Sequence, residues 1–253
     1  CAMFFGSQIV EKYGYMPEEY FLYFEETDWT YGLKCKGVTL FAHPNTSIIH
    51  AKTSHDNGLP TLAYGYYLSR GALLFARKYG FNVRKTASRH MGTFVRHWCN
   101  IVEETSPIYA AVFRQLCKAG LADGRQKVHG PVDILVRLAE NSGPYFRRSQ
   151  GFLECVDLKT GNLHGWAGEK WFFLPRTPRL AIFVDNFFVG DVEPTINRPD
   201  IKALGFSVKA GFHYKLQNLS QMQETRVDVL NACTCQPLFA TKAVFQKDAT
   251  RKR

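Results

Sequence analysis

The spacing of apolar residues predicts two long helical regions in the first half of the chain. Residues 61–79 carry apolar side chains at helical spacing, and the pattern ends at Gly80. A second helical region spans residues 85–120 and is interrupted at Ser106-Pro107, where proline suits a helix start. A basic connector is expected to follow at residues 121–130.

Shorter patterns before residue 61 predict strands that alternate with helices. Residues 8–13 read as a helix with Ser7 as N-cap and Gly14 as stop, and residues 25–36 suit a helix of about three turns. Short apolar runs predict strands at residues 1–5, 20–24, 38–42 and 46–51. This alternation indicates an α/β domain over residues 1–133.

After residue 133 the pattern changes to short strands separated by turns. Residues 134–150 read as a linker, and residues 151–247 are typical of an all-β sandwich, followed by a basic tail at residues 248–253. The clearest turn signals are Thr160-Gly161-Asn162 and the hairpin pair Asp185-Asn186.

The composition of the chain does not change the predicted fold, but its charge bears on which binding partners are expected. Of 253 residues, 45% are hydrophobic and 21% charged, and no window is long and apolar enough to cross a bilayer. The net charge of +10 favours anionic partners such as nucleotide phosphates or acidic lipids, although a merely basic surface fits equally well. Basic residues do not interleave with aromatic ones along one face, so no nucleic-acid partner is expected.

The seven cysteines, an odd number spread over both parts, favour reduced thiols and a cytoplasmic location over a disulfide framework. Cys233 and Cys235 are expected on one face of a strand, where buried packing is favoured over a zinc site. The chain starts at Cys1 within an expected strand, and we therefore expect a fragment of a longer protein.

Candidate chemistry concentrates in residues 20–37, YFLYFEETDWTYGLKCKG. An aromatic run leads into Glu25, Glu26 and Asp28 at the expected helix start, followed by Trp29. A helix N-terminus stabilises negative charge, so the acids fit either a catalytic base or an ordinary solvated helix start. His50 at a strand end, and Arg70 beside Tyr66-Tyr67, are structural residues unless further evidence links them to the acids.

The order of these features resembles the C-terminal half of bacterial inverting family-2 glycosyltransferases, especially rhamnosyltransferase-like and galactofuranosyltransferase-like members. The matching segments are CAMFF at the start, EEYFLYFEETDW at residues 18–29, IIH at residues 48–50 and YYLSRGALLFARKY at residues 66–79. The resemblance covers about half of the chain. It implies the C-terminal part of a GT-A (nucleotide-diphospho-sugar transferase) fold with a helical extension.

The resemblance also implies a mechanism and a set of site residues. Glu26 maps to the general base, which takes the proton of an acceptor hydroxyl as that oxygen attacks the anomeric carbon of a nucleotide-sugar donor. His50 maps to a histidine that helps to hold a divalent cation, Mg²⁺ or Mn²⁺, or the diphosphate. The remaining candidates, for acceptor or phosphate contacts, are Glu25, Asp28, Trp29, Lys52 and Arg70.

The chain departs from the family pattern at three points. Gly32 stands where the family usually has arginine, which removes an expected partner of the acids, and Gly71 stands where it has asparagine. No Asp-x-Asp metal motif precedes Glu26, and the donor-binding half of the family is absent from this chain. We therefore expect no turnover from this chain alone.

The later part resembles a β-sandwich module appended to bacterial glycosyltransferases, through Gly165-Trp166-Ala167 and Val184-Asp185-Asn186. Trp166, Trp171 and Phe172-Phe173 suit a buried core or a docking face better than a glycan platform. The expected function is sugar transfer to a glycan or lipid-linked acceptor in bacterial surface polysaccharide synthesis, with peripheral contact at the cytoplasmic membrane face. The alternative is a non-catalytic glycan-binding or scaffold protein.

Overall fold

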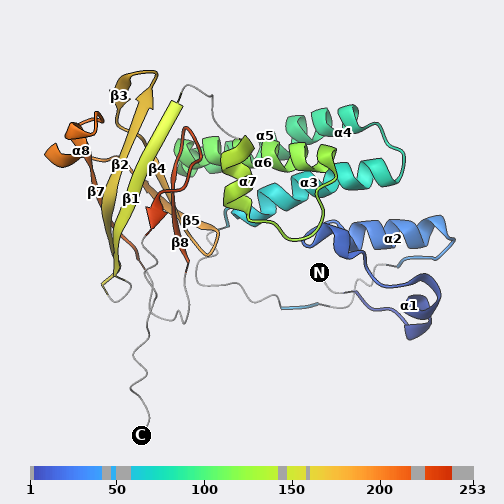
Figure 1. Cartoon of the computed structure of the whole chain (residues 1–253). Helices are drawn as coiled ribbons and strands as arrows, with labels where there is room; N and C mark the ends of the chain where they lie inside the picture. Colours follow the sequence, from blue (N-terminus) through green and yellow to red (C-terminus); the bar gives the residue numbers. More distant parts are fainter. Residues whose placement is uncertain are drawn as a thin grey trace, which may run out of the picture.

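The computed structural model describes residues 3–41, 47–49, 58–141, 147–157, 160–217 and 226–240. The fold is a mixture of helices and antiparallel sheets, as the sequence predicts. In the described part of the chain, every helix except a short one inside the sandwich precedes the first strand (Figure 1). Helices and strands are therefore segregated along the chain rather than alternating.

The helical part is built around two long helices that pack side by side and run in the same direction. Its elements are α1 (Ser7–Tyr13), the 3-10 turn η1 (Glu18–Tyr20), α2 (Glu25–Cys35), α3 (Leu62–Lys78), α4 (Val83–His90), the π-helical turn η2 (Met91–Val95), α5 (Arg96–Thr105), α6 (Pro107–Gln126) and α7 (Ile134–Asn141). Thr61 caps α3 by accepting from the Tyr64 amide at 3.0 Å. Ser106 caps α6, with Pro107 at its first position. Both caps lie where the sequence signals predict helix starts.

Helices α3 and α6 approach closely because glycines face the contact. A Cβ at Gly120 would lie 2.3 Å from the Tyr66 carbonyl oxygen, and one at Gly124 would lie 2.7 Å from that of Arg70. These glycines serve helix packing rather than helix termination, so α6 continues to Gln126 through much of the segment expected as a connector. The helix ends at Lys127, which has a left-handed conformation (φ 60°).

Two sheets form the later part of the chain. The larger sheet has the order β6-β7-β2-β1-β9 with β3 paired to β2, and the smaller one has the order β5-β4-β8. The strands are β1 (Arg147–Asp157), β2 (Asn162–Trp171), β3 (Leu174–Arg176), β4 (Leu180–Val184), β5 (Phe187–Val192), β6 (Ile196–Asn197), β7 (Lys209–Lys215), β8 (Val227–Asn231) and β9 (Phe239–Ala240), with the short helix α8 (Pro199–Ala203) before β7. All pairs are antiparallel except β1 with β9.

The expected turns at Thr160-Gly161 and Asp185-Asn186 are confirmed. Asp185 and Asn186 both have positive φ, 48° and 71°, which suits a tight hairpin.

Strand β4 is buried on both faces and joins three layers. Leu180, Ile182 and Val184 enter the core between the two sheets. Ala181 and Phe183 point the other way, into the core formed with the helices. The order of layers is therefore large sheet, small sheet and helices, which Figure 1 shows from left to right.

Several strand predictions in the first part are wrong. Residues 3–5, 38–41 and 47–49 form no strand, and residues 20–24 form a 3-10 turn and bends. Residues 1–2, 42–46 and 50–51 lie outside the described part of the chain. The segment expected as a linker contains α7, whose Ile134, Leu135 and Leu138 are buried against α6.

Cys233 and Cys235 do not share a strand face. Strand β8 ends at Asn231, and the two cysteines lie in the turn that follows it. Cys235 is buried with a positive φ of 54°, whereas Cys233 is exposed. In the described part of the chain, no helix has both the length and the apolar character needed to cross a bilayer.

Candidate functional site

The acidic block is presented by a compact turn that leads into α2. After η1, Phe21, Tyr23 and Phe24 have positive φ values of 66°, 61° and 74°, so the chain reverses instead of extending. The aromatic side chains pack against α3, Phe21 on Tyr67 and Phe24 on Phe75. The turn therefore sets Glu25 as the first residue of α2.

Gly71 leaves room for this turn. A Cβ at Gly71 would lie 2.7 Å from the Phe24 ring. The departure from the family pattern at this position thus coincides with a close contact between α3 and the residue that precedes the acids.

Glu25 and Glu26 are half-buried in the first turn of α2. In each, the Oε2 atom is shielded from solvent and accepts no hydrogen bond from the described residues. Burial raises the pKa of Glu25, the charge of Glu26 raises it further, and a backbone hydrogen bond opposes both effects. We call Glu25 and Glu26 the acid pair; each carboxylate is partly desolvated, and a carboxylate can accept a proton from a hydroxyl within hydrogen-bond reach.

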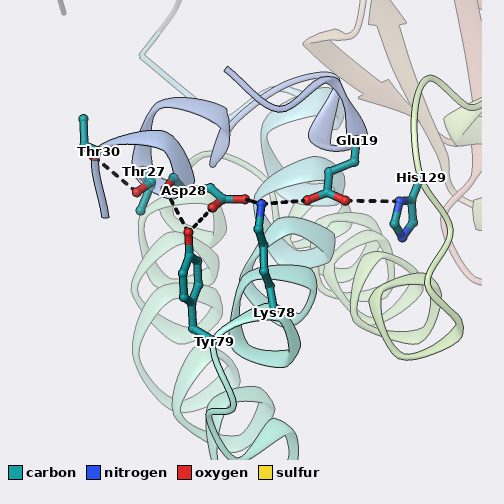
Figure 2. A network of polar contacts seen from close by, with 7 residues as sticks. All are labelled: Glu19, Thr27, Asp28, Thr30, Lys78, Tyr79 and His129. Carbon is teal, nitrogen blue, oxygen red and sulfur yellow. Dashed lines mark hydrogen bonds and ion pairs between the residues drawn. The ribbon is translucent and has the colours of Figure 1, made fainter. Parts of the chain in front are cut away.

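Asp28 has a different environment, because its carboxylate is buried and bonded to the protein itself. Lys78 donates to it from Nζ at 2.6 Å and Tyr79 donates from its hydroxyl at 2.5 Å (Figure 2). Lys78 also contacts Glu19, which lies 3.5 Å from the Nδ1 of His129. This chain of contacts fastens α2 to the C-terminal end of α3.

Gly32 explains how Tyr79 reaches Asp28. A Cβ at Gly32 would lie 3.1 Å from the Tyr79 hydroxyl oxygen, closer than a side chain normally packs. Lys78 and Tyr79 therefore bind the Asp28 carboxylate. The resemblance would lead one to expect an arginine at position 32 to do this. Neither Lys78 nor Tyr79 was assigned a role from the sequence, and their place in the family motif was the only available signal.

Trp29 is buried rather than open to a sugar. Its indole Nε1 donates to the Gly14 carbonyl at 3.0 Å, and its ring makes an edge contact with Phe5 at 4.8 Å. Trp29 and Asp28 line a cavity of ≈ 330 Å³ between α1, α2 and α3, whose wall includes neither Glu25 nor Glu26. The structure thus separates the four predicted residues of the block into two pairs.

Arg70 is fully buried, and its guanidinium donates hydrogen bonds to backbone carbonyl groups of the same chain. Its guanidinium donates to the Gly130 oxygen at 2.7 Å and to the Tyr20 oxygen at 2.6 Å, and it lies 4.6 Å from the centre of the Tyr67 ring. Burial lowers the pKa of Arg70. These contacts hold the turn before α2 against α3, and a direct contact between Arg70 and a substrate stays a prediction.

Asp123, a buried polar residue on α6, was not identified from the sequence. Asp123 accepts from the Tyr66 hydroxyl at 2.5 Å and from Arg137 of α7. An acid on the apolar face of a predicted helix is the signal that could have found it.

A larger cavity of ≈ 420 Å³ lies beside the turn that carries the acids. Phe24, Phe75 and Phe81 form part of its apolar wall, and Lys85 and Arg89 of α4 add positive charge. Phe24 directly precedes Glu25, but the wall of this cavity includes neither Glu25 nor Glu26.

His50 and Lys52 lie outside the described residues, so the structure does not relate them to the acid pair. Within residues 3–41, 47–49 and the later described ranges, no three His, Cys, Asp or Glu side chains gather as metal ligands. The described residues therefore do not supply a ligand set for the expected cation.

Phe172 and Phe173 were expected in a core or a docking face, and they do not belong to the core. Both are exposed at the turn between β2 and β3. Trp166 lies on β2, a central strand of the large sheet, and packs against Ile201 and Phe206.

Comparison of the chain with models of known protein families, with curated proteins and with solved structures finds no match.

Proposed function

We propose that this chain is the acceptor-binding half of a GT-A-type inverting glycosyltransferase and that Glu26 is its general base. The observation that carries the proposal is the acid pair in the first turn of α2. The Glu26 carboxylate has an oxygen that is shielded from solvent and accepts no hydrogen bond from the described residues. A carboxylate in this condition is available to accept a proton from a bound hydroxyl.

The proposed reaction is a single displacement. The acceptor hydroxyl gives its proton to Glu26 while its oxygen forms the new bond to the anomeric carbon of the donor sugar. The bond to the nucleoside diphosphate breaks on the opposite face, the diphosphate leaves with the bonding electrons, and the anomeric centre is inverted. Burial raises the pKa of Glu25, and the nearby charge of Glu26 raises it further.

The surrounding contacts support this role by fixing α2. The Asp28 contacts with Lys78 and Tyr79 hold one side of the helix, and Arg70 holds the turn before it through Tyr20. Such restraint keeps a base at the short distance that proton transfer requires. We place part of the acceptor in the cavity next to Phe24, where Lys85 and Arg89 would suit an anionic acceptor.

The leaving diphosphate needs positive charge to stabilise it, and the resemblance implies a divalent cation for this purpose. The described residues contain no ligand set for such an ion, so the proposed steps involve only the chain's own side chains and the two substrates. The proposal gives this chain the acceptor side of the reaction only.

A non-catalytic glycan-binding or scaffold protein is the second candidate. It is favoured by the burial of Asp28, Trp29 and Arg70, which are bonded to the chain itself instead of facing a ligand.

The test uses a protein in which this chain follows a donor-binding half that contains an Asp-x-Asp motif. Glu26→Gln is expected to lower kcat by about 10² to 10⁴-fold with little change in KM, because the glutamine cannot accept the proton. Glu11→Gln, at an exposed glutamate of α1 outside the matching segments, is the matched control and is expected to transfer sugar at the wild-type rate.

Two outcomes would contradict the assignment. Wild-type transfer by the Glu26→Gln variant would exclude Glu26 as the base. Glycan binding without transfer in every variant, including the wild type, would favour the non-catalytic protein.

A further inference from the structure

The turn between β2 and β3 exposes an apolar tip. Trp171 pairs with Leu174 across the hairpin, so Phe172 and Phe173 alone form the loop. The exposed fractions are 64% for Phe172, 93% for Phe173 and 67% for Leu174. We call these three residues the β2–β3 tip.

The residues of the tip are poorly suited to forming its turn. Phe172 has a positive φ of 55°, a conformation that costs energy for a bulky side chain and that hairpin turns normally give to glycine or asparagine. The β4–β5 hairpin of the same sandwich places Asp185 and Asn186 in this conformation. Turn formation therefore does not explain Phe172, and a residue held in a strained backbone conformation is a reason to look for a function at this place.

Basic residues surround the tip. Lys170 and the exposed Arg176 flank it on β2 and β3. Glu169, the nearest acid on β2, is buried.

Helix α8 extends this basic and apolar surface. Lys170 donates from Nζ to the Leu204 carbonyl at 3.0 Å, which holds the end of α8 beside the hairpin. Figure 1 shows α8 and β3 at the same end of the sandwich. Leu204 is 58% exposed, and the exposed Lys202 adds a further positive charge there.

We propose that the β2–β3 tip inserts into the surface of a bilayer that contains anionic phospholipids. Phe172, Phe173 and Leu174 enter the boundary between headgroups and acyl chains, while Lys170 and Arg176 lie at the lipid phosphates. Apolar insertion and attraction to anionic lipid are each weak alone and give stable binding together. This surface is distant in sequence from the acid pair, and the proposal does not depend on sugar transfer.

The chemistry of the tip favours lipid over glycan. Phenylalanine and leucine side chains offer no hydrogen bond to sugar hydroxyls. The aromatic face of Trp171, which could stack on a sugar, is covered by the Arg176 guanidinium at 4.5 Å from the ring centre. A protruding hairpin with a basic border fits a flat charged surface better than a small polar ligand.

The test measures binding of the full chain to vesicles by co-sedimentation. Vesicles that mix phosphatidylcholine with phosphatidylglycerol are compared with vesicles of phosphatidylcholine alone. We expect the wild type to bind the anionic vesicles more strongly and to release at high salt.

The double variant Phe172→Gly with Phe173→Asn removes the apolar tip and supplies residues that suit the turn. It is expected to fold at least as stably as the wild type and to bind anionic vesicles at least about tenfold more weakly, because two phenyl groups no longer leave water. Lys202→Gln is expected to weaken binding about fivefold on anionic vesicles and not on neutral ones. Phe41→Asn removes a phenylalanine that is 90% exposed in the segment after α2, outside the sandwich, and is the matched control, with unchanged binding.

The proposal is overturned if the wild type stays in solution with anionic vesicles or if the double variant binds as well as the wild type. Self-association that is lost in the double variant, without vesicle binding by the wild type, would assign the tip to a protein contact. Glycan binding that is lost in the double variant, again without vesicle binding, would assign the tip to sugar recognition.

Discussion

Asp28 fixes the acid-bearing helix at the scale of single residues. Its buried carboxylate needs donors within the protein, and Lys78 and Tyr79 provide them from the end of α3. Glu25 and Glu26, three and two residues earlier, have no hydrogen-bond partner among the described residues at their shielded Oε2 atoms. The same short block thus contains one carboxylate that anchors the helix and two that can take part in chemistry.

His90 gives a prediction about pH at the same scale. Burial lowers its pKa from 6.5 to about 4, and its Nε2 lies 2.9 Å from the Ser69 hydroxyl. The unfolded chain then binds a proton more readily than the folded one, so His90 contributes stability above its unfolded pKa and this contribution is lost as pH falls. The free energy of unfolding is expected to drop by about 2 kcal/mol from this residue on going from neutral pH to about pH 5.

Urea unfolding of the wild type and of His90→Gln at both pH values checks this expectation. Glutamine keeps a hydrogen-bonding group near Ser69 and does not titrate, so the variant is expected to lose less stability in acid than the wild type. An equal loss in the two proteins would mean that His90 is not responsible.

The residue-scale features differ in how far the sequence could predict them. Glu25 and Glu26 at a helix start follow from local signals, and the structure agrees with that placement. The partners of Asp28 lie about fifty residues away on α3, and only folding brings them together. The burial of Trp29 and Arg70 likewise depends on α1, Tyr20 and Gly130, which no local pattern links to them.

The close contact of α3 and α6 gives a prediction at the scale of elements. A methyl group at Gly120 would overlap the backbone of α3 at Tyr66, so Gly120→Ala is expected to lower the free energy of unfolding by about 1 to 3 kcal/mol. Gly92→Ala, where the nearest atom is the flexible end of Arg96 at 3.7 Å, is expected to be neutral or slightly stabilising. Chemical denaturation of both variants measures the difference, and equal stabilities would contradict the packing argument.

The failed strand at residues 20–24 shows why aromatic runs mislead at this scale. Aromatic residues favour strands because they pack on a pleated surface beside a neighbouring strand. Here the rings of Phe21, Tyr23 and Phe24 pack on Tyr67, Tyr64 and Phe75 of one helix instead. The hairpin at Asp185-Asn186 was predictable because its turn residues carry the signal themselves.

At the scale of the whole molecule, β4 makes the helices and the sandwich parts of one packed body. Phe183 contacts Tyr109 of α6, and Ser106 donates to Asp191 of β5 at 2.6 Å. The sequence did not predict this contact, because the change of pattern near residue 133 suggests separate domains while the shared core joins residues distant in the chain. Helices do give way to strands near residue 133, but the two parts share one hydrophobic core.

A pair of neighbouring substitutions tests this arrangement. Ile182→Ala opens the core between the sheets, and Phe183→Ala opens the core toward the helices. Each is expected to lower the free energy of unfolding by about 2 to 5 kcal/mol, and in each variant circular dichroism and tryptophan fluorescence should report one coincident transition. Two separated transitions, with only one moved by each variant, would show that the helices and the sandwich unfold independently.

Helix α3 connects the two ends of this body. At its start, the Leu62 amide donates to the Asn186 carbonyl of the β4–β5 turn at 3.1 Å, and at its end Lys78 binds Asp28. Its 17 residues span about 25 Å at the rise of an α-helix. The helix therefore links the sandwich, at its start, to the acid-bearing helix, at its end. If the sandwich rests on a surface, the length of α3 contributes to the distance between that surface and the acid-bearing helix.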